Sequence, residues 1–126
     1  MEKKIIETKS APAPIGPYSQ AVQAGNLLFV SGQVAIDPAT GAVMQQNIQA
    51  ETKQVMENLK AILNEAGMDF SNIIKTTIFL TDMGTFAQVN EIYGSYFKSN
   101  FPARETVQVS ALPKAVNVEI SVICSI

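Results

Sequence analysis

The chain ends in Val116-Asn-Val-Glu-Ile-Ser-Val-Ile-Cys-Ser-Ile126, where every even-numbered position is apolar. Alternation over this length predicts a long β-strand, because successive side chains of a strand point to opposite faces. The odd-numbered positions between them are polar except for Ile123. We therefore expect this strand to have a hydrophobic core on one side and a partly polar surface on the other.

The other elements follow from the same kind of periodicity. Residues 47–66 and 85–98 have apolar side chains at helical spacing, and five segments resemble strands: residues 4–7, 21–24, 27–34, 73–80 and 106–109. Asn47 and Gly67 are suited to begin and end the first helix, Thr85-x-x-Gln88 resembles a capping box, and Gly25-Asn26 predicts a hairpin turn. The order β-β-β-α-β-α-β-β predicts an α+β fold. We expect one domain over residues 1–126, with a single mixed six-stranded sheet and two helices on one face.

The amino-acid composition excludes several kinds of catalytic and metal-binding site. The 126 residues include no histidine and only one cysteine, Cys124. This excludes a Ser-His-Asp triad, a Cys-His dyad and a zinc site with histidine ligands, and we expect neither a metal nor a cofactor. A lone cysteine forms no intrachain disulfide, which fits a reducing, cytoplasmic compartment. The net charge of −2 lacks the basic footprint of a nucleic-acid-binding protein, and no apolar run approaches the length of a membrane helix.

The sheet face away from the helices is expected to need a cover. Residues 27–34 are apolar on both sides, with Leu28 and Val30 on one and Leu27 and Phe29 on the other. A chain of this length with two helices has no second layer to place there. We therefore expect a homo-oligomer whose interface is this face, with polar residues lining clefts at its edge.

Alternation also places two charged residues. Val107 and Val109 form one side of their strand, which leaves Arg104 on the other side. If the apolar sides of the last two strands both face the helices, Arg104 and Glu119 share the opposite face, whether or not another strand lies between them. The planar fork of an arginine suits a small carboxylate, and a carboxylate can orient or deprotonate water. The alternatives are a surface cation or a structural salt bridge for Arg104, and an ion pair with Arg104 or with a lysine for Glu119.

Some other positions have both a structural and a functional interpretation, and some have only a structural one. Tyr18 follows a proline-rich loop, where it packs on the core or faces a ligand. Ser31 and Gly32 end an apolar strand. At Gly32 the structural alternatives are close backbone packing or a bulge, and the functional one is backbone groups exposed to a ligand. Cys124 alternates with apolar residues, so we interpret it as a core residue rather than a nucleophile. No partner marks Lys114 as catalytic.

Several short motifs together resemble one known family. They are Ala13-Pro-Ile-Gly-Pro-Tyr-Ser-Gln20, Leu28-Phe-Val-Ser-Gly-Gln33, Lys75-Thr-Thr-Ile-Phe-Leu80, Val89-Asn-Glu-Ile-Tyr93, Phe101-Pro-Ala-Arg104, Leu112-Pro and Val118-Glu-Ile120. Along essentially its whole length the chain resembles the Rid family of reactive intermediate deaminases, also called the YjgF or endoribonuclease L-PSP family, and within it the 2-iminobutanoate/2-iminopropanoate deaminases. The resemblance implies a fold like that of Bacillus-type chorismate mutase. It also implies a homotrimer whose sheets form a central barrel, with three clefts between subunits.

The resemblance gives each matched position a role. Arg104 would hold the substrate carboxylate, Glu119 would position and activate the hydrolytic water, and Tyr18 would close over the ligand. The remaining implied site residues contact the ligand or line the cleft: Ser31, Gly32, Thr106 through its backbone, Asn90 and Phe86. The implied reaction hydrolyses 2-aminoacrylate, 2-iminopropanoate or 2-iminobutanoate to a 2-oxo acid and ammonia, without metal or cofactor.

The implied substrates arise from pyridoxal-phosphate dehydratases that act on serine or threonine. One alternative is a non-catalytic or regulatory trimer that binds a small 2-oxo acid or amino acid in the same clefts. Another is a ribonuclease or translation inhibitor, against which the net charge and the absence of histidine argue. Two positions depart from the family pattern: Glu105 stands where many members have a small residue, and Thr106 where some have cysteine. Strand parity places Glu105 on the face opposite Arg104.

Overall fold

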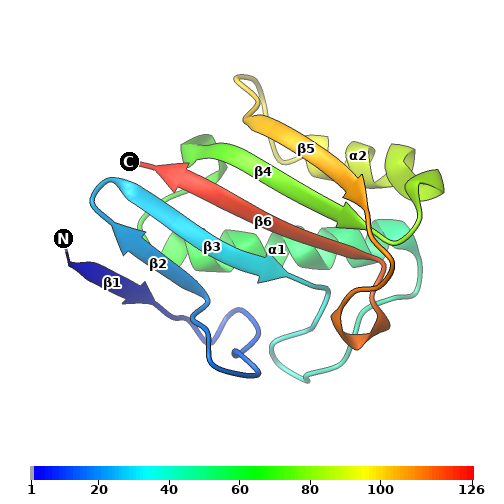
Figure 1. The fold of residues 1–126 in the computed structure, drawn as a ribbon, viewed down its shortest axis with the longest axis horizontal. Coiled ribbons are helices and arrows are strands. Elements are labelled where there is room, and N and C mark those ends of the chain that lie inside the picture. Colours follow the sequence, from blue (N-terminus) through cyan, green and yellow to red (C-terminus); the bar gives the residue numbers. More distant parts are fainter. Residues whose placement is uncertain (1) are drawn as a thin grey trace.

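The alternating C-terminal segment forms an interior strand of the sheet in the computed structural model, which describes residues 2–126 (Figure 1). The strands are β1 (Lys3–Ile6), β2 (Ala21–Ala24), β3 (Leu27–Gln33), β4 (Ile73–Leu80), β5 (Ala103–Gln108) and β6 (Val118–Ser125), and the helices are α1 (Ile48–Glu65) and α2 (Phe86–Gly94). Their order in the sheet is β1-β2-β3-β6-β4-β5, and every neighbouring pair is antiparallel except β4 with β5. The predicted α+β fold with one mixed six-stranded sheet is confirmed.

Both helices pack on the same face of the sheet, which is the far side in Figure 1. The apolar stripe of α1 is fully buried there: Val55, Met56, Leu59, Ile62 and Leu63. It meets the even-numbered residues of β6, including Cys124, which is wholly buried. Burial raises the pKa of the Cys124 thiol to about 12, so this thiol has no nucleophilic role at neutral pH.

The ends of α1 are as predicted. The side chain of Asn47 accepts a hydrogen bond from the Ala50 backbone N–H at 2.7 Å, which satisfies one of the free donors of the first turn. After the helix, Gly67 adopts a φ of 73°, a left-handed conformation that glycine reaches without steric cost.

Helix α2 is shorter than predicted, and the capping-box prediction at its start is wrong. The helix ends at Gly94, and Thr85 makes no side-chain hydrogen bond to the first turn. The chain instead enters α2 from a 3-10 turn, η2 (Met83–Thr85), which Asp82 caps by accepting from the Gly84 N–H at 2.8 Å. The Thr85 hydroxyl donates back to the Asp82 carbonyl oxygen.

Strand β4 lies between β5 and β6, so the last two strands do not form a hairpin. In the registers, Thr76 of β4 pairs with Arg104 on one side and with Val122 on the other, whereas Phe79 pairs with Glu119. Thr76 and Val122 are buried under the helices. Arg104 therefore lies on the helix-covered face and Glu119 on the open face, and the prediction that they share a face is wrong.

The error comes from the edge position of β5. Val107 pairs with Phe79, lies on the open face and is 41% exposed, so its apolar side does not face the helices. An edge strand with few apolar residues does not reveal which of its sides is covered. Glu105 does lie opposite Arg104, as expected, because neighbouring residues of a strand point to opposite faces.

An apolar row crosses the open face. Ile5, Val22, Phe29 and Ile123 are successive partners on β1, β2, β3 and β6. Ile5 and Phe29 are 49% and 45% exposed. No element of residues 2–126 lies over this row, so the expectation of an intermolecular cover stays a prediction. None of the helices described in residues 2–126 has the length and apolarity needed to span a membrane.

Candidate functional site

Six of the eight predicted site residues line two separate pockets, and Phe86 and Thr106 line neither. The first, called the Glu119 pocket, has a volume of about 530 Å³ and is lined by Ile15, Tyr18, Ser31, Gly32, Val34, Ile36, Pro113, Lys114 and Glu119. The second, called the Arg104 pocket, has a volume of about 480 Å³ and is lined by Asn90, Tyr93, Gly94, Phe101, Pro102 and Arg104. Each pocket thus holds one of the two charged residues that the sequence singled out.

Gly32 makes room for the Glu119 carboxylate. The register of β3 against β6 shifts between Val30 and Gln33, which marks a bulge beside Glu119. A Cβ atom on residue 32 would lie 2.7 Å from the carboxyl carbon of Glu119, closer than any stable contact. Both structural features considered for Gly32, a bulge and a close approach, therefore occur together at the pocket.

The electrostatic setting of Glu119 is that of an unpaired, half-buried acid. Burial raises the pKa of its carboxyl above the ordinary value of 4.5, and neither a hydrogen bond nor a cation from residues 2–126 counteracts this. Near neutral pH, the raised pKa brings the protonated and ionised forms of the Glu119 carboxyl closer in free energy. This is typical of groups that exchange protons during catalysis.

A loop from the N-terminal part of the chain forms the rim of the Glu119 pocket. The Ser31 hydroxyl donates to the Ser19 carbonyl at 2.6 Å, and the Ser31 N–H donates to the Gln20 carbonyl at 2.9 Å. Tyr18 is 53% exposed, and its hydroxyl oxygen accepts from the Ile15 N–H at 3.4 Å. The ring of Tyr18 thus stands at the mouth of the pocket and not in the core.

Helix α2 holds the Arg104 guanidinium from one side. The guanidinium carbon lies 5.5 Å from the ring centre of Phe86 and 5.2 Å from that of Tyr93, distances typical of cation–π contacts. One of its N–H groups donates to the Asn90 side-chain oxygen at 2.6 Å. Phe86, Asn90 and Tyr93 follow one another at helical spacing, so a single face of α2 orients the arginine.

Arg104 has no carboxylate partner among residues 2–126. Most of its N–H donors therefore stay available to an anion in the pocket, and a guanidinium can bind a carboxylate through two parallel hydrogen bonds. A structural ion pair between Arg104 and Glu119, one of the alternatives considered, does not form within one chain, because they lie on opposite faces of the sheet.

Two polar residues that line these pockets, Tyr93 and Lys114, were not among the predicted site residues. Tyr93 stacks on Arg104, and its buried hydroxyl donates to the Thr76 hydroxyl at 2.9 Å. Burial raises the pKa of the Tyr93 hydroxyl. Its spacing from Asn90 on one helical stripe was the available signal. Lys114 lines the Glu119 pocket from a turn, η3 (Pro113–Ala115), in which it adopts a φ of 57°. No periodic pattern predicts this.

The two positions that depart from the family pattern lie outside both pockets. The Thr106 hydroxyl oxygen is buried and lacks a hydrogen-bond partner within residues 2–126. Glu105 accepts from the Thr77 hydroxyl at 2.8 Å and pairs with Lys75 at 3.3 Å. The Thr77 hydrogen bond, then Lys75, holds the pKa of the Glu105 carboxyl below its ordinary value.

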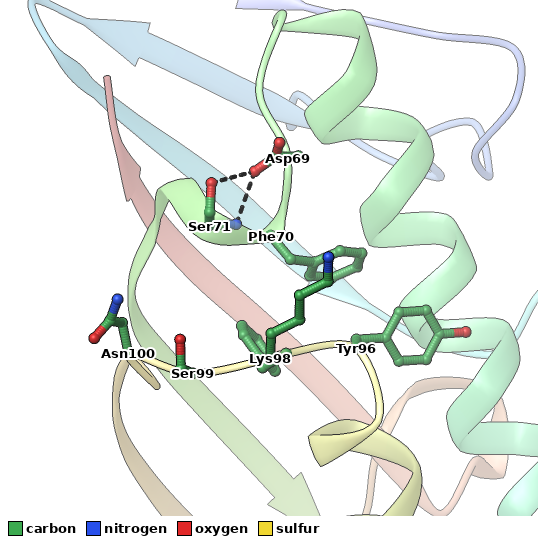
Figure 2. A pocket seen from close by; sticks show the side chains of 8 residues that line it. Asp69, Phe70, Ser71, Tyr96, Lys98, Ser99 and Asn100 are labelled. Carbon is green, nitrogen blue, oxygen red and sulfur yellow. Dashed lines mark hydrogen bonds between the residues drawn. The ribbon is translucent and has the colours of Figure 1, made fainter.

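A third pocket contains none of the predicted site residues (Figure 2). It has a volume of about 480 Å³, and its lining includes Asp69, Ser71 and Lys98 together with the aromatic residues Phe70, Tyr96 and Phe97. Asp69 accepts from the N–H and the hydroxyl of Ser71, at 2.8 and 2.5 Å. Its carboxylate is therefore engaged within its own turn. In the described part of the chain, no three acidic or cysteine side chains gather where they could hold a metal ion.

Comparisons with a family model, with known sequences and with solved structures all give matches over nearly the whole chain. Residues 8–126 match the model of the family described as Endoribonuclease L-PSP. Protein DfrA of Myxococcus xanthus is 55% identical over 125 residues, covering 98% of this chain and 95% of that protein. The 2-iminobutanoate/2-iminopropanoate deaminase of Mus musculus is 50% identical over 121 residues, covering 96% and 90%. The crystal structure of E. coli TdcF with bound serine has a TM-score of 0.94 and 43% identity, covering 98% of both chains.

Proposed function

The chain belongs to the endoribonuclease L-PSP family, and on that premise we propose that it hydrolyses 2-imino and 2-enamine acids to 2-oxo acids and ammonia. The observation that carries the proposal is a pair of unsatisfied groups. Arg104 has free donors for a carboxylate, and Glu119 is a desolvated carboxylate without a partner among residues 2–126. The name of the mouse relative, which states this reaction class, supports the same chemistry.

The two groups act on one substrate only if two subunits supply them. Arg104 lies at the edge of the helix-covered face and Glu119 on the open face. We infer a homotrimer in which the edge of one subunit meets the open face of the next, so that each Arg104 pocket joins a neighbour's Glu119 pocket. A ring of head-to-tail contacts closes with equivalent sites and covers the apolar row of the open face.

The reaction needs little more than positioning. Arg104 binds the substrate carboxylate. Glu119 accepts a proton from a water molecule while the oxygen of that water bonds to the electrophilic iminium carbon. The Glu119 carboxyl then returns the proton to the nitrogen. As the carbon–nitrogen bond breaks, the added oxygen forms the carbonyl and gives its remaining proton to the Glu119 carboxylate, which passes it to the departing ammonia. A raised pKa suits this exchange, because the carboxyl must both take up and release the proton. Tyr18, Ser31 and Gly32 border the reacting end.

A coupled assay tests the activity. Threonine dehydratase releases 2-iminobutanoate, and semicarbazide captures the fraction that escapes hydrolysis. Adding the pure protein is expected to lower the captured imine and to speed the release of 2-oxobutanoate. If neither quantity changes, this protein is not a deaminase of that imine class, and the 2-aminoacrylate formed from serine is the remaining substrate to test in the same format.

Subunit mixing tests the shared site. Arg104→Ala and Glu119→Gln are each expected to lose nearly all of the wild-type activity. When the two variants are unfolded together in equal amounts and refolded, about a quarter of the sites receive an intact arginine and an intact carboxylate, so about a quarter of the wild-type activity returns. A site built within one chain would regain none, because every chain carries a defect. Each variant refolded alone is the control.

A ligand-binding role is the second candidate, and the bound serine in the TdcF structure favours it. In that case the wild-type protein binds serine or 2-oxobutanoate, as measured by calorimetry, without affecting imine capture. Arg104→Ala then abolishes binding, whereas Glu119→Gln leaves it unchanged, since binding a carboxylate needs no group that directs water.

A further inference from the structure

A second glutamate lies directly beneath the start of β6. Glu51 of α1 is completely buried, yet it is a carboxylate. It accepts hydrogen bonds from the Asn117 backbone N–H at 2.7 Å, the Asn117 side-chain amide at 2.8 Å and the Val118 N–H at 3.1 Å. Buried carboxylates are rare unless they are satisfied in this way, and all three donors belong to the two residues that precede Glu119.

The chain that enters β6 is strained, and hydrogen bonds hold it from several sides. Lys114 and Ala115 adopt φ values of 57° and 54°, two consecutive left-handed residues without a glycine. Such backbone persists where its surroundings over-determine it. The Gln45 side-chain amide donates to the Ala115 carbonyl at 3.1 Å, and the Thr81 N–H donates to the Asn117 carbonyl at 3.1 Å. Of Gln45, Thr81 and Glu51, the residues that hold this segment by hydrogen bonds, only Glu51 is charged.

We propose that Glu51 is a positioning residue for Glu119. By holding Asn117 and Val118 it sets the height and direction of the first β6 residues, and thereby keeps the Glu119 carboxylate over Gly32. Glu51 itself lies on the helix-covered side and contacts no substrate. The inference rests on the proposed function, in which Glu119 directs the hydrolytic water, and it adds the residue that aims that group.

Two substitutions at this position separate hydrogen bonding from charge. Glu51→Met keeps the volume but removes every acceptor. Glu51→Gln removes the charge but keeps the contacts, because its oxygen accepts from both backbone N–H groups and its amide donates to the Asn117 side-chain oxygen once that amide turns over. We expect Glu51→Met to lose about tenfold or more in kcat with little change in KM, since misplacement of a reacting group costs rate and the Arg104 pocket is untouched. Glu51→Gln is expected to stay within about threefold of wild type, because its geometry is retained.

Titration of Glu119 gives a readout that does not depend on turnover. In full-length protein with labelled carboxyl carbons, nuclear magnetic resonance follows the ionisation of Glu119 directly. In Glu51→Met the pKa of Glu119 is expected to fall towards its ordinary value, because the carboxyl leaves its desolvated position. In Glu51→Gln it is expected to stay raised. A fall of equal size in both variants would show an effect of charge alone and would overturn the proposal.

Thr52→Val is the matched control, because Thr52 is equally buried on the next position of α1 and bonds only to the Ile48 carbonyl within the helix. It is expected to keep wild-type kcat. If it loses as much kcat as Glu51→Met, or if Glu51→Met keeps full kcat, the positioning role is wrong. Should Glu51→Met not fold, Asn117→Ala removes one of the three hydrogen bonds and is judged by the same two readouts. If the wild-type protein hydrolyses no imine, the proposed function fails, and the Glu119 titration still decides the positioning role.

Discussion

The Arg104 pocket and the Glu119 pocket are built in different ways on one sheet. Arg104 belongs to the edge strand β5, is exposed, and is oriented from the side by Phe86, Asn90 and Tyr93 of one helix. Glu119 belongs to the interior strand β6 and lies against the backbone of Gly32. Stacking on rings leaves the arginine some freedom to meet a ligand, whereas close backbone contact leaves the carboxylate little. The difference matches a group that captures substrate and a group that must be aimed.

The largest effect is expected from Glu119→Gln. Removing the proton acceptor is expected to lower kcat by about 100-fold or more while KM changes little. In the wild type, acidification through the raised pKa of Glu119 protonates the base, so kcat should fall at a pH above the ordinary value of 4.5. Steady-state kinetics between about pH 5 and 8 would measure both effects. Unchanged kcat in the variant would assign water activation to another group.

The same variant tests the raised pKa through stability. Because the fold favours protonated Glu119, the ionised carboxylate opposes folding above its folded-state pKa, and this cost disappears below the ordinary value of 4.5. Glu119→Gln is therefore expected to be at least as stable as wild type at pH 7, with the difference closing as the pH falls. Urea unfolding at several pH values measures it. A less stable variant at pH 7 would indicate a stabilising partner for Glu119 in the assembled protein.

Arg104→Lys comes next and acts on the other pocket. Lysine keeps the charge but loses the two-pronged carboxylate contact and the stacking on Phe86 and Tyr93. A hydrogen bond to a charged group contributes about 1.5–3 kcal/mol, so KM is expected to rise by about 10- to 100-fold with a smaller change in kcat. Kinetics over a wide imine concentration range distinguish this from a loss of kcat alone, which would make Arg104 part of the reacting set.

Gly32→Ala sharpens the contrast further, because it changes no functional group. The added methyl would displace the Glu119 carboxylate, and we expect about a tenfold loss of kcat. A double variant with Glu119→Gln provides the control. If Gly32→Ala acts through Glu119, it adds no further loss in that background. An additional loss of the same size would point to a direct contact between ligand and backbone at residue 32.

The smallest effect is expected from Asn90→Ala. It removes one of the three supports of Arg104 but leaves both rings in place, so KM should rise by about threefold, the equivalent of one modest hydrogen bond. Competitive inhibition by a 2-oxo acid gives an independent measure of the same loss. An effect as large as that of Arg104→Lys would mean that Asn90 contacts the substrate itself.

Local patterns predicted much of this protein. The alternation of β6, the Asn47 cap and the Gly67 stop each depend on residues within a few positions, so the core face of β6 and both ends of α1 could be read directly. The motifs also marked residues that the fold gathers into pockets, Tyr18 and Ser31 with Glu119 among them. Helix α2 is shorter than its periodicity predicts, because the periodic stripe continues into a turn beyond Gly94.

Other features follow only from the tertiary structure. The sequence indicated that Arg104 and Glu119 are candidate site residues. That they lie on opposite faces of the sheet depends on β4 lying between β5 and β6, which no local pattern encodes. The anchoring of β6 by Glu51 joins residues 66 positions apart in the chain. Periodicity describes one segment at a time, whereas strand order and buried hydrogen bonds arise when distant segments pack together. Residue types and spacing therefore determined which groups are candidates for the chemistry, and packing decided where each of them points.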